Sequence, residues 1–285
     1  MGILLGVLSA ASWGTSDFMG GLLTRRMSAL RVLAWSQLAG AVLIVVIALL
    51  AHAPITLSII GWGMFGGISG IIGLLALYRG LALGPMALVS PISACGAIVP
   101  LIAAAISGHL PPPVALVGIA LAFGGIVLAS LAGGTPSPQT KQPARLVTSG
   151  VGYAGIAALG IGFFFIALAH GAAGQPLATL WTVASARLTT IMVLFGALTV
   201  RRADLRVPRG NVAQLIGIGF FDTGANTLYA FATTFGNLGI VSVLGSLYPV
   251  MTVLLALGVL RERLALRQSF GVVLALAGVA LMALG

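Results

Sequence analysis

The chain has 285 residues, of which 59% are hydrophobic and 6% are charged, whereas about 25% of the residues of a soluble domain are charged. A chain this apolar cannot cover its surface with polar groups, which excludes a soluble protein and indicates an integral membrane protein. Fourteen Lys and Arg against four Asp and Glu give a formal net charge of +10, so the basic residues mark either a nucleic-acid partner or one face of a membrane.

Helices that cross a bilayer need about 20 predominantly apolar residues, and runs of this kind occur ten times along the chain. We therefore predict an all-α integral membrane protein with ten transmembrane helices. Because the runs use nearly all of the chain, no soluble domain fits between them. The predicted spans are residues 3–23, 31–51, 58–80, 86–107, 113–132, 148–170, 177–199, 211–234, 238–260 and 266–284.

The longest connection between predicted spans contains three prolines, which interrupt any helix. We interpret this segment, residues 133–147, as a cytoplasmic linker. It separates a first half, residues 1–132, from a second half, residues 148–285. Each half contains five of the predicted spans.

The basic residues occur at every second predicted connection. Thirteen of the 14 Lys and Arg residues lie in the odd-numbered connections or within two residues of their ends, and none lies in the even-numbered ones. Because short basic loops stay in the cytoplasm, the pattern predicts cytoplasmic odd loops and both termini outside. We expect a multi-pass protein of the cell membrane, the inner membrane or plasma membrane, and no nucleic-acid partner.

The two halves share an internal repeat. Glycines seven residues apart recur in the fifth and tenth spans, at Gly118 with Gly125 and at Gly271 with Gly278. Two further matches follow the same order, Tyr78 with Tyr229 and Gln37 with Arg187. A repeat of five spans, an odd number, must insert in two opposite orientations. Such inverted repeats are typical of secondary transporters, which hold the substrate near the membrane midplane and work by alternating access.

The ninth span and the residues that follow it carry a family resemblance. The segment 245–252 (GSLYPVMT), then 261–264 (RERL), and Gln268 ahead of Gly271 resemble the second half of the EamA-like branch of the drug/metabolite transporter superfamily. The resemblance covers essentially the whole chain and is strongest over residues 225–285. It implies a ten-helix protein of two inverted five-helix repeats that moves a small metabolite through a central cavity, often as an exporter.

Three ionisable residues lie too deep in predicted spans to be assigned to the connections, namely Asp17, Arg187 and Asp222. A charge at a helix centre costs about 2.5–3.5 kcal/mol on insertion scales, so these side chains should face the bundle interior or water. Arg187 lies about ten residues into its span and Asp222 about eleven, which places both near the midplane. We hypothesise that they approach each other, with Asp222 offsetting Arg187 or exchanging with a substrate carboxylate. A static pair that holds two helices together is an equal alternative.

Asp17 lies some two-thirds of the way along the first span, beside the short hydroxyl side chains of Thr15 and Ser16. An isolated carboxylate in a low-dielectric medium binds a proton readily, which is the property that proton coupling needs. We therefore consider a transporter coupled to protons. The alternative is a carboxylate that is hydrogen-bonded to polar neighbours or reaches cytoplasmic water.

Polar and aromatic residues at similar depths could line a cavity for an amphipathic metabolite, because Trp and Tyr combine a flat apolar face with a hydrogen-bonding edge. Taken singly, each is more often a packed membrane residue than a ligand contact. The candidates are Trp13, Gln37, Tyr78, Asn226, Tyr229 and Ser242. The pair Tyr248-Pro249 should interrupt the helix of the ninth span, since proline cannot donate a backbone hydrogen bond.

Groups for enzyme chemistry are scarce in this sequence. It has four carboxylates, no metal-binding motif and no glycine-rich phosphate loop, so we expect no catalytic residues, no metal and no cofactor. The predicted function is secondary transport of a small amino-acid-like or other amphipathic solute, with export favoured. A lipid-headgroup flippase and an uptake permease of the same fold are the alternatives. Because one polypeptide contains both halves, we expect it to function as a monomer in the lipid bilayer.

Overall fold

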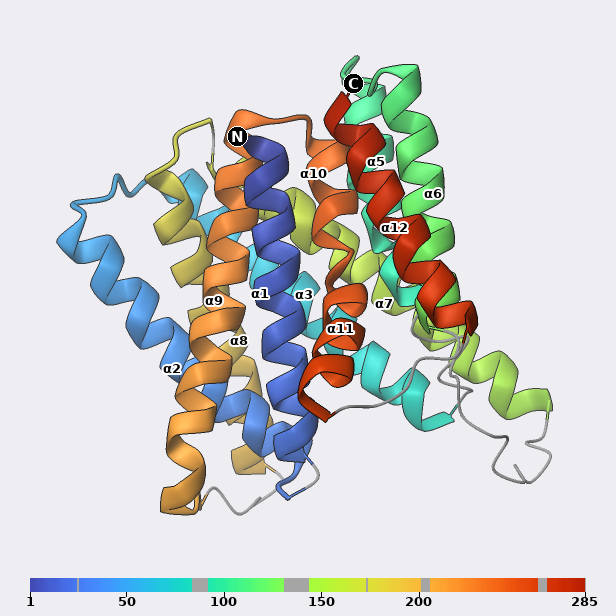
Figure 1. The fold of residues 1–285 in the computed structure, drawn as a ribbon. Coiled ribbons are helices and arrows are strands. Elements are labelled where there is room, and N and C mark those ends of the chain that lie inside the picture. Colours follow the sequence, from blue (N-terminus) through green and yellow to red (C-terminus); the bar gives the residue numbers. More distant parts are fainter. Residues whose placement is uncertain are drawn as a thin grey trace. The chain divides into compact units, whose positions relative to one another are not determined.

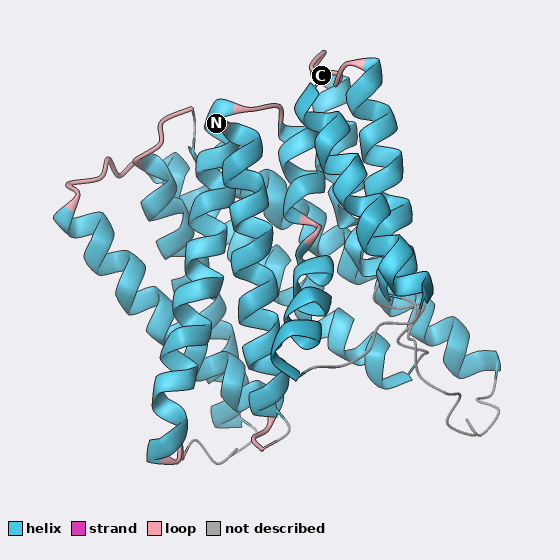
Figure 2. Cartoon of the chain, viewed as in Figure 1, coloured by secondary structure: helices cyan, strands magenta, loops and turns pink. Residues whose placement is uncertain are grey.

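The computed structural model describes residues 1–24, 26–83, 92–130, 144–172, 174–200, 206–260 and 266–284. In these residues the chain forms helices joined by short loops and contains no strand (Figure 2). Four of the described helical segments are long and apolar enough to cross a membrane, and shorter apolar helices accompany them. The four are Leu30–Leu50, Leu57–Leu77, Ser149–Ala172 and Ala178–Val200.

The helices group into two compact units, and each unit takes segments from both halves of the sequence. Unit 1 comprises Met1–Ile68 and Ala167–Phe235. Its complete helices are α1 (Gly2–Thr24), α2 (Ala29–Leu50), α8 (Ala178–Val200), the 3-10 turn η2 (Arg209–Asn211) and α9 (Val212–Phe235). Within the unit, α1 packs along α9, and α2 packs against both α8 and α9 (Figure 1).

Unit 2 comprises Ser69–Ile166 and Gly236–Gly285. It contains the 3-10 turn η1 (Cys95–Ala97), α5 (Ile98–Ile106), α6 (Pro113–Ser130), α10 (Leu238–Gly245), α11 (Tyr248–Leu260) and α12 (Leu266–Leu284). Two long helices, α3 (Leu57–Leu83) and α7 (Ala144–Ala172), contribute segments to both units. The repeat-related glycine helices α6 and α12 pack directly on each other. A Cβ added at Gly118 would lie 2.7 Å from the carbonyl oxygen of Gly278, so both backbones need glycine there.

The ninth predicted span is interrupted where the sequence indicated. Helix α10 ends at Gly245 and α11 begins at Tyr248, which places Pro249 in the first turn of a new helix. Proline is tolerated in a first turn because its missing N–H would have no partner there. The fourth predicted span contains a similar irregularity that the sequence did not indicate. There η1 precedes α5, and Pro100 lies in the first turn of α5.

Glycines allow a close approach of α2 and α9 in unit 1. A Cβ at Gly40 would collide with the side chain of Thr223 and lie 2.9 Å from the carbonyl oxygen of Gly219. A Cβ at Gly219 would collide with the carbonyl oxygen of Ser36 and lie 2.8 Å from the amide nitrogen of Gly40. Two backbones in contact cannot give way as a flexible side chain can, so this crossing sets the distance between α2 and α9.

We expect Gly219→Ala to destabilise the folded protein by about 1–3 kcal/mol, because the added methyl group overpacks the crossing. The measurement is the melting temperature of the purified protein in detergent. Gly196→Ala in α8 is the matched control, since nothing lies within 4 Å of a Cβ at Gly196. Equal melting temperatures for the two variants would contradict a tight crossing.

Candidate functional site

Gln37, Arg187 and Asp222 meet within unit 1, from α2, α8 and α9 respectively. The Arg187 guanidinium donates through Nη1 to Oδ2 of Asp222 at 2.6 Å and also to Oε1 of Gln37. Gln37 in turn donates from Nε2 to the same Oδ2 at 2.9 Å. The three side chains form a closed triangle, which we call the polar cluster.

The accessible surface of the polar cluster belongs mainly to its carboxylate. The Arg187 side chain is 8% exposed, and that of Asp222 is 22% exposed. Three buried polar atoms at or beside the cluster have no hydrogen-bond partner, namely Nη2 of Arg187, Oγ1 of Thr223 and Oδ1 of Asn226. A buried polar atom needs a hydrogen-bond partner, so these three atoms mark the polar positions at which a solute or water could be bound.

Asp17 lies on α1 with an exposed side chain, and its carboxylate is close enough to that of Asp222 for the two to repel each other. Asp17, Arg187 and Asp222 therefore bring one guanidinium and two carboxyl groups together. Trp13 precedes Asp17 by four residues, so both lie on the same face of α1. The Trp13 ring lies 5.8 Å from that of Tyr229, centroid to centroid.

A ladder of serines on α1 fixes the helix that carries Asp222. Ser9 donates to the carbonyl oxygen of Ala225 at 2.8 Å, and Ser12 donates to that of Phe221 at 2.6 Å. Ser16 donates to the carbonyl oxygen of Ile218 at 3.1 Å. Sequence reasoning missed these positioning residues, although their spacing of three and four residues places them on one helix face.

The remaining predicted cavity residues fall into two groups. Gln37, Asn226 and Tyr229 are buried in unit 1, and Trp13 is half-buried beside them. Ser242 is buried in unit 2, where its hydroxyl group donates to the carbonyl oxygen of Leu238 at 2.7 Å. The side chain of Tyr78, also in unit 2, lies outside the described residues. The structure thus places four of these six residues in unit 1, the unit that contains the polar cluster.

Metal ligands do not gather at this site. In the part of the chain that the structure describes, no group of three or more His, Cys, Asp or Glu side chains could hold a metal ion. What the site offers is a guanidinium, two carboxylates, amides and aromatic faces, which suit recognition of a charged amphipathic solute.

Comparison with protein families gives the chain its identity. The model of the EamA-like transporter family matches residues 1–131 and again residues 148–284. The chain belongs to the EamA-like transporter family. Its members are transporters of the drug/metabolite type, so this EamA-like chain is a multi-pass membrane protein with a small-molecule substrate.

Comparison with solved structures supports the fold of this EamA-like chain. A structure titled "Crystal structure of protein" superposes with a TM-score of 0.75 at 17% sequence identity, over 99% of this chain and 96% of the other. This likeness concerns the fold alone. The comparison with curated proteins found no match.

Proposed function

We propose that the protein is a secondary transporter that exports a small amphipathic metabolite by alternating access, with its binding site at the polar cluster and Asp17. The observation that carries the proposal is the Gln37–Arg187–Asp222 triangle, in which one charged pair within the membrane coexists with unpaired buried polar atoms. Charged residues inside membrane bundles are expensive and mark substrate and ion pathways. Export is the direction that the sequence resemblance implies.

The charges at the site favour a substrate with an amino group. One guanidinium against two carboxylates leaves one negative charge, and the exposed carboxylate of Asp17 is its accessible part. An ammonium group would pair with Asp17 while the Trp13 ring covers apolar parts of the solute. A substrate carboxylate would find the unpaired Nη2 of Arg187 once the pair with Asp222 opens. Amino-acid-like solutes combine both groups.

A transport assay with matched solutes tests this substrate class. Purified protein in liposomes is offered an amino acid, the amine that lacks its carboxylate and the acid that lacks its amino group. We expect flux above that of empty liposomes for the amino acid and the amine, and none for the acid. Flux of the acid alone would contradict the proposal.

We further propose ten transmembrane helices arranged as two inverted five-helix repeats, residues 1–132 and 148–285, joined by the cytoplasmic linker. The two matches of the family model, which leave residues 132–147 between them, support this arrangement. A single chain then supplies both repeats and functions as a monomer. A proton taken up by Asp17 would supply the driving force.

Reporter fusions at the C-terminus test the orientation. Because the basic residues keep the odd loops in the cytoplasm, we expect a C-terminal alkaline phosphatase to be active and a C-terminal green fluorescent protein to be dark. The same reporters inserted in the linker, residues 133–147, are the control and should give the opposite readings. A fluorescent C-terminal fusion would refute the orientation in the cell membrane.

A further inference from the structure

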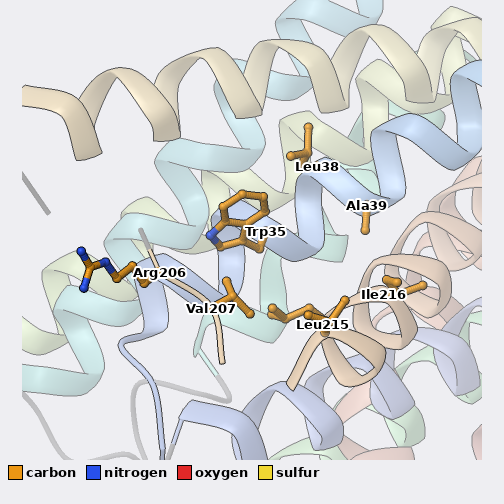
Figure 3. Close-up of a pocket in the computed structure, with 8 residues that line it drawn as sticks. Trp35, Leu38, Ala39, Arg206, Val207, Leu215 and Ile216 are labelled. Atoms are coloured by element: carbon orange, nitrogen blue, oxygen red, sulfur yellow. The ribbon is translucent and has the colours of Figure 1, made fainter. Parts of the chain in front are cut away.

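Unit 1 carries an apolar groove of about 510 Å³ between α2 and α9. Trp35, Leu38 and Ala39 form its α2 wall, and Leu215 and Ile216 contribute to its α9 wall (Figure 3). Val212 also lines the α9 wall, so each wall has the i, i+3, i+4 spacing of one helix face, and the groove runs along both helices. It is separate from the polar cluster, whose contacts it does not include.

Arginines gather at one end of the groove. Arg206 lines this end, and its side chain extends outward from the apolar walls (Figure 3). Arg31 donates through Nη1 to the backbone carbonyl oxygen of Arg206 at 3.1 Å, which fixes a second guanidinium there. Arg209 lies in the turn η2 immediately before α9, and Arg26 lies in the α1–α2 connection. Asp204, the acidic residue nearest in sequence, lies outside the described residues.

The groove rests on a packed base. The Trp35 ring meets Phe195 edge to face at 6.0 Å, centroid to centroid. Beside it, apolar side chains from α1, the α1–α2 connection, α2 and α9 form a buried cluster, Leu23, Met27, Val32, Leu215 and Ile218. Because these residues are 1–7% exposed, the groove is built into the fold.

The chemistry of the groove indicates its occupant. Its α9 wall is exposed at Val212, by 42%, and at Ile216, by 55%, and in a membrane such surface faces lipid hydrocarbon. An apolar groove that ends in a cluster of guanidinium groups matches an acyl chain joined to a phosphate. We propose that this groove binds an anionic phospholipid, with an acyl chain along α2 and α9 and the phosphate beside Arg206 and Arg31. The site does not depend on the transport function proposed above.

Lipid competition on the purified full chain tests the site. The protein is incubated with equal amounts of phosphatidylglycerol and phosphatidylcholine that share the same acyl chains, and native mass spectrometry measures the ratio bound. We expect an excess of phosphatidylglycerol on the wild type. Arg206→Gln should lower the ratio about fivefold, the effect of one basic residue near a lipid surface. Ile216→Trp should lower binding of both lipids by filling the groove.

Arg267→Gln is the matched control, because Arg267 is an exposed arginine at the start of α12 in unit 2 and its loss removes the same charge elsewhere. It should leave the ratio unchanged. If Arg206→Gln does not fold, Arg209→Gln replaces it at the same end of the groove. Equal binding of both lipids by the wild type, or equal losses in Arg206→Gln and Arg267→Gln, would overturn the proposal.

Discussion

Asp222→Asn should reduce transport at least tenfold and also lower the yield of folded protein. The substitution leaves the Arg187 guanidinium buried without a charged partner, and breaking a buried ion pair from one side costs about 3–5 kcal/mol. Arg187→Leu should destabilise the protein less, because Asp222 is more exposed than Arg187 and keeps its hydrogen bond from Gln37. Melting temperatures and solute flux in liposomes, measured on the same preparations, check both expectations.

Thr227→Val is the matched control for these variants. Thr227 lies on the same helix as Asp222, and its hydroxyl group donates to the carbonyl oxygen of Thr223 in its own helix at 2.9 Å. Its loss removes a polar atom without touching the polar cluster, so flux and melting temperature should stay near those of the wild type. Full transport by Asp222→Asn, once corrected for yield, would leave the pair a purely structural role.

Asp17→Asn should abolish the response of transport to a proton gradient while leaving the folded yield unchanged. Asp17 is exposed, and its removal relieves repulsion with Asp222, so the variant loses no stabilising contact of the polar cluster. A neutral amide cannot take up and release a proton, so solute flux would no longer follow an imposed pH gradient. The measurement is flux into and out of liposomes with a pH difference of either sign.

Asp17→Glu is the informative comparison, because it keeps the carboxylate on a longer side chain and should retain part of the gradient response. Melting temperatures of the two variants show whether folding is preserved. Gradient-driven flux that is equal in the wild type and Asp17→Asn would exclude coupling at this residue.

The sequence predicted the all-helical character of the described residues and their apolar spans because the bilayer imposes a length on each apolar run, whereas the ten-helix arrangement stays a prediction. The predicted spans 3–23 and 177–199 illustrate the agreement, since the structure has α1 at Gly2–Thr24 and α8 at Ala178–Val200. Proline chemistry predicted the interruption at Tyr248-Pro249. The 3-10 turn at Cys95–Ala97 was missed, since neither residue type nor apolar pattern marks it.

The sequence also singled out the two charged members of the polar cluster, Arg187 and Asp222, because a charge in a membrane is too costly to be incidental. The structure shows the hypothesised contact between Arg187 and Asp222, although its role in transport stays a prediction. The sequence placed Gln37 among the cavity residues but did not predict that it bridges Arg187 and Asp222. Helix pairing explains this gap, because residue patterns say which face is polar but not which helix it meets.

The packing of α1 on α9 was the least predictable feature. Ser9 and Ala225 are joined by a hydrogen bond across 216 positions of sequence, and serine is common wherever membrane helices pack closely. The compact units follow from such contacts between distant segments, whereas the predicted halves follow from sequence order. The apolar groove was equally hidden, because it depends on the crossing of α2 and α9.

Solute flux by the neutral double variant Arg187→Leu/Asp222→Asn tests the central claim most directly. Removing both charges avoids an unpaired buried charge, so the folded yield should recover relative to Asp222→Asn alone. If the polar cluster is the transport site, the double variant in liposomes will fold and yet show flux no higher than empty liposomes. Flux equal to that of the wild type would contradict the claim and assign the pair to helix packing.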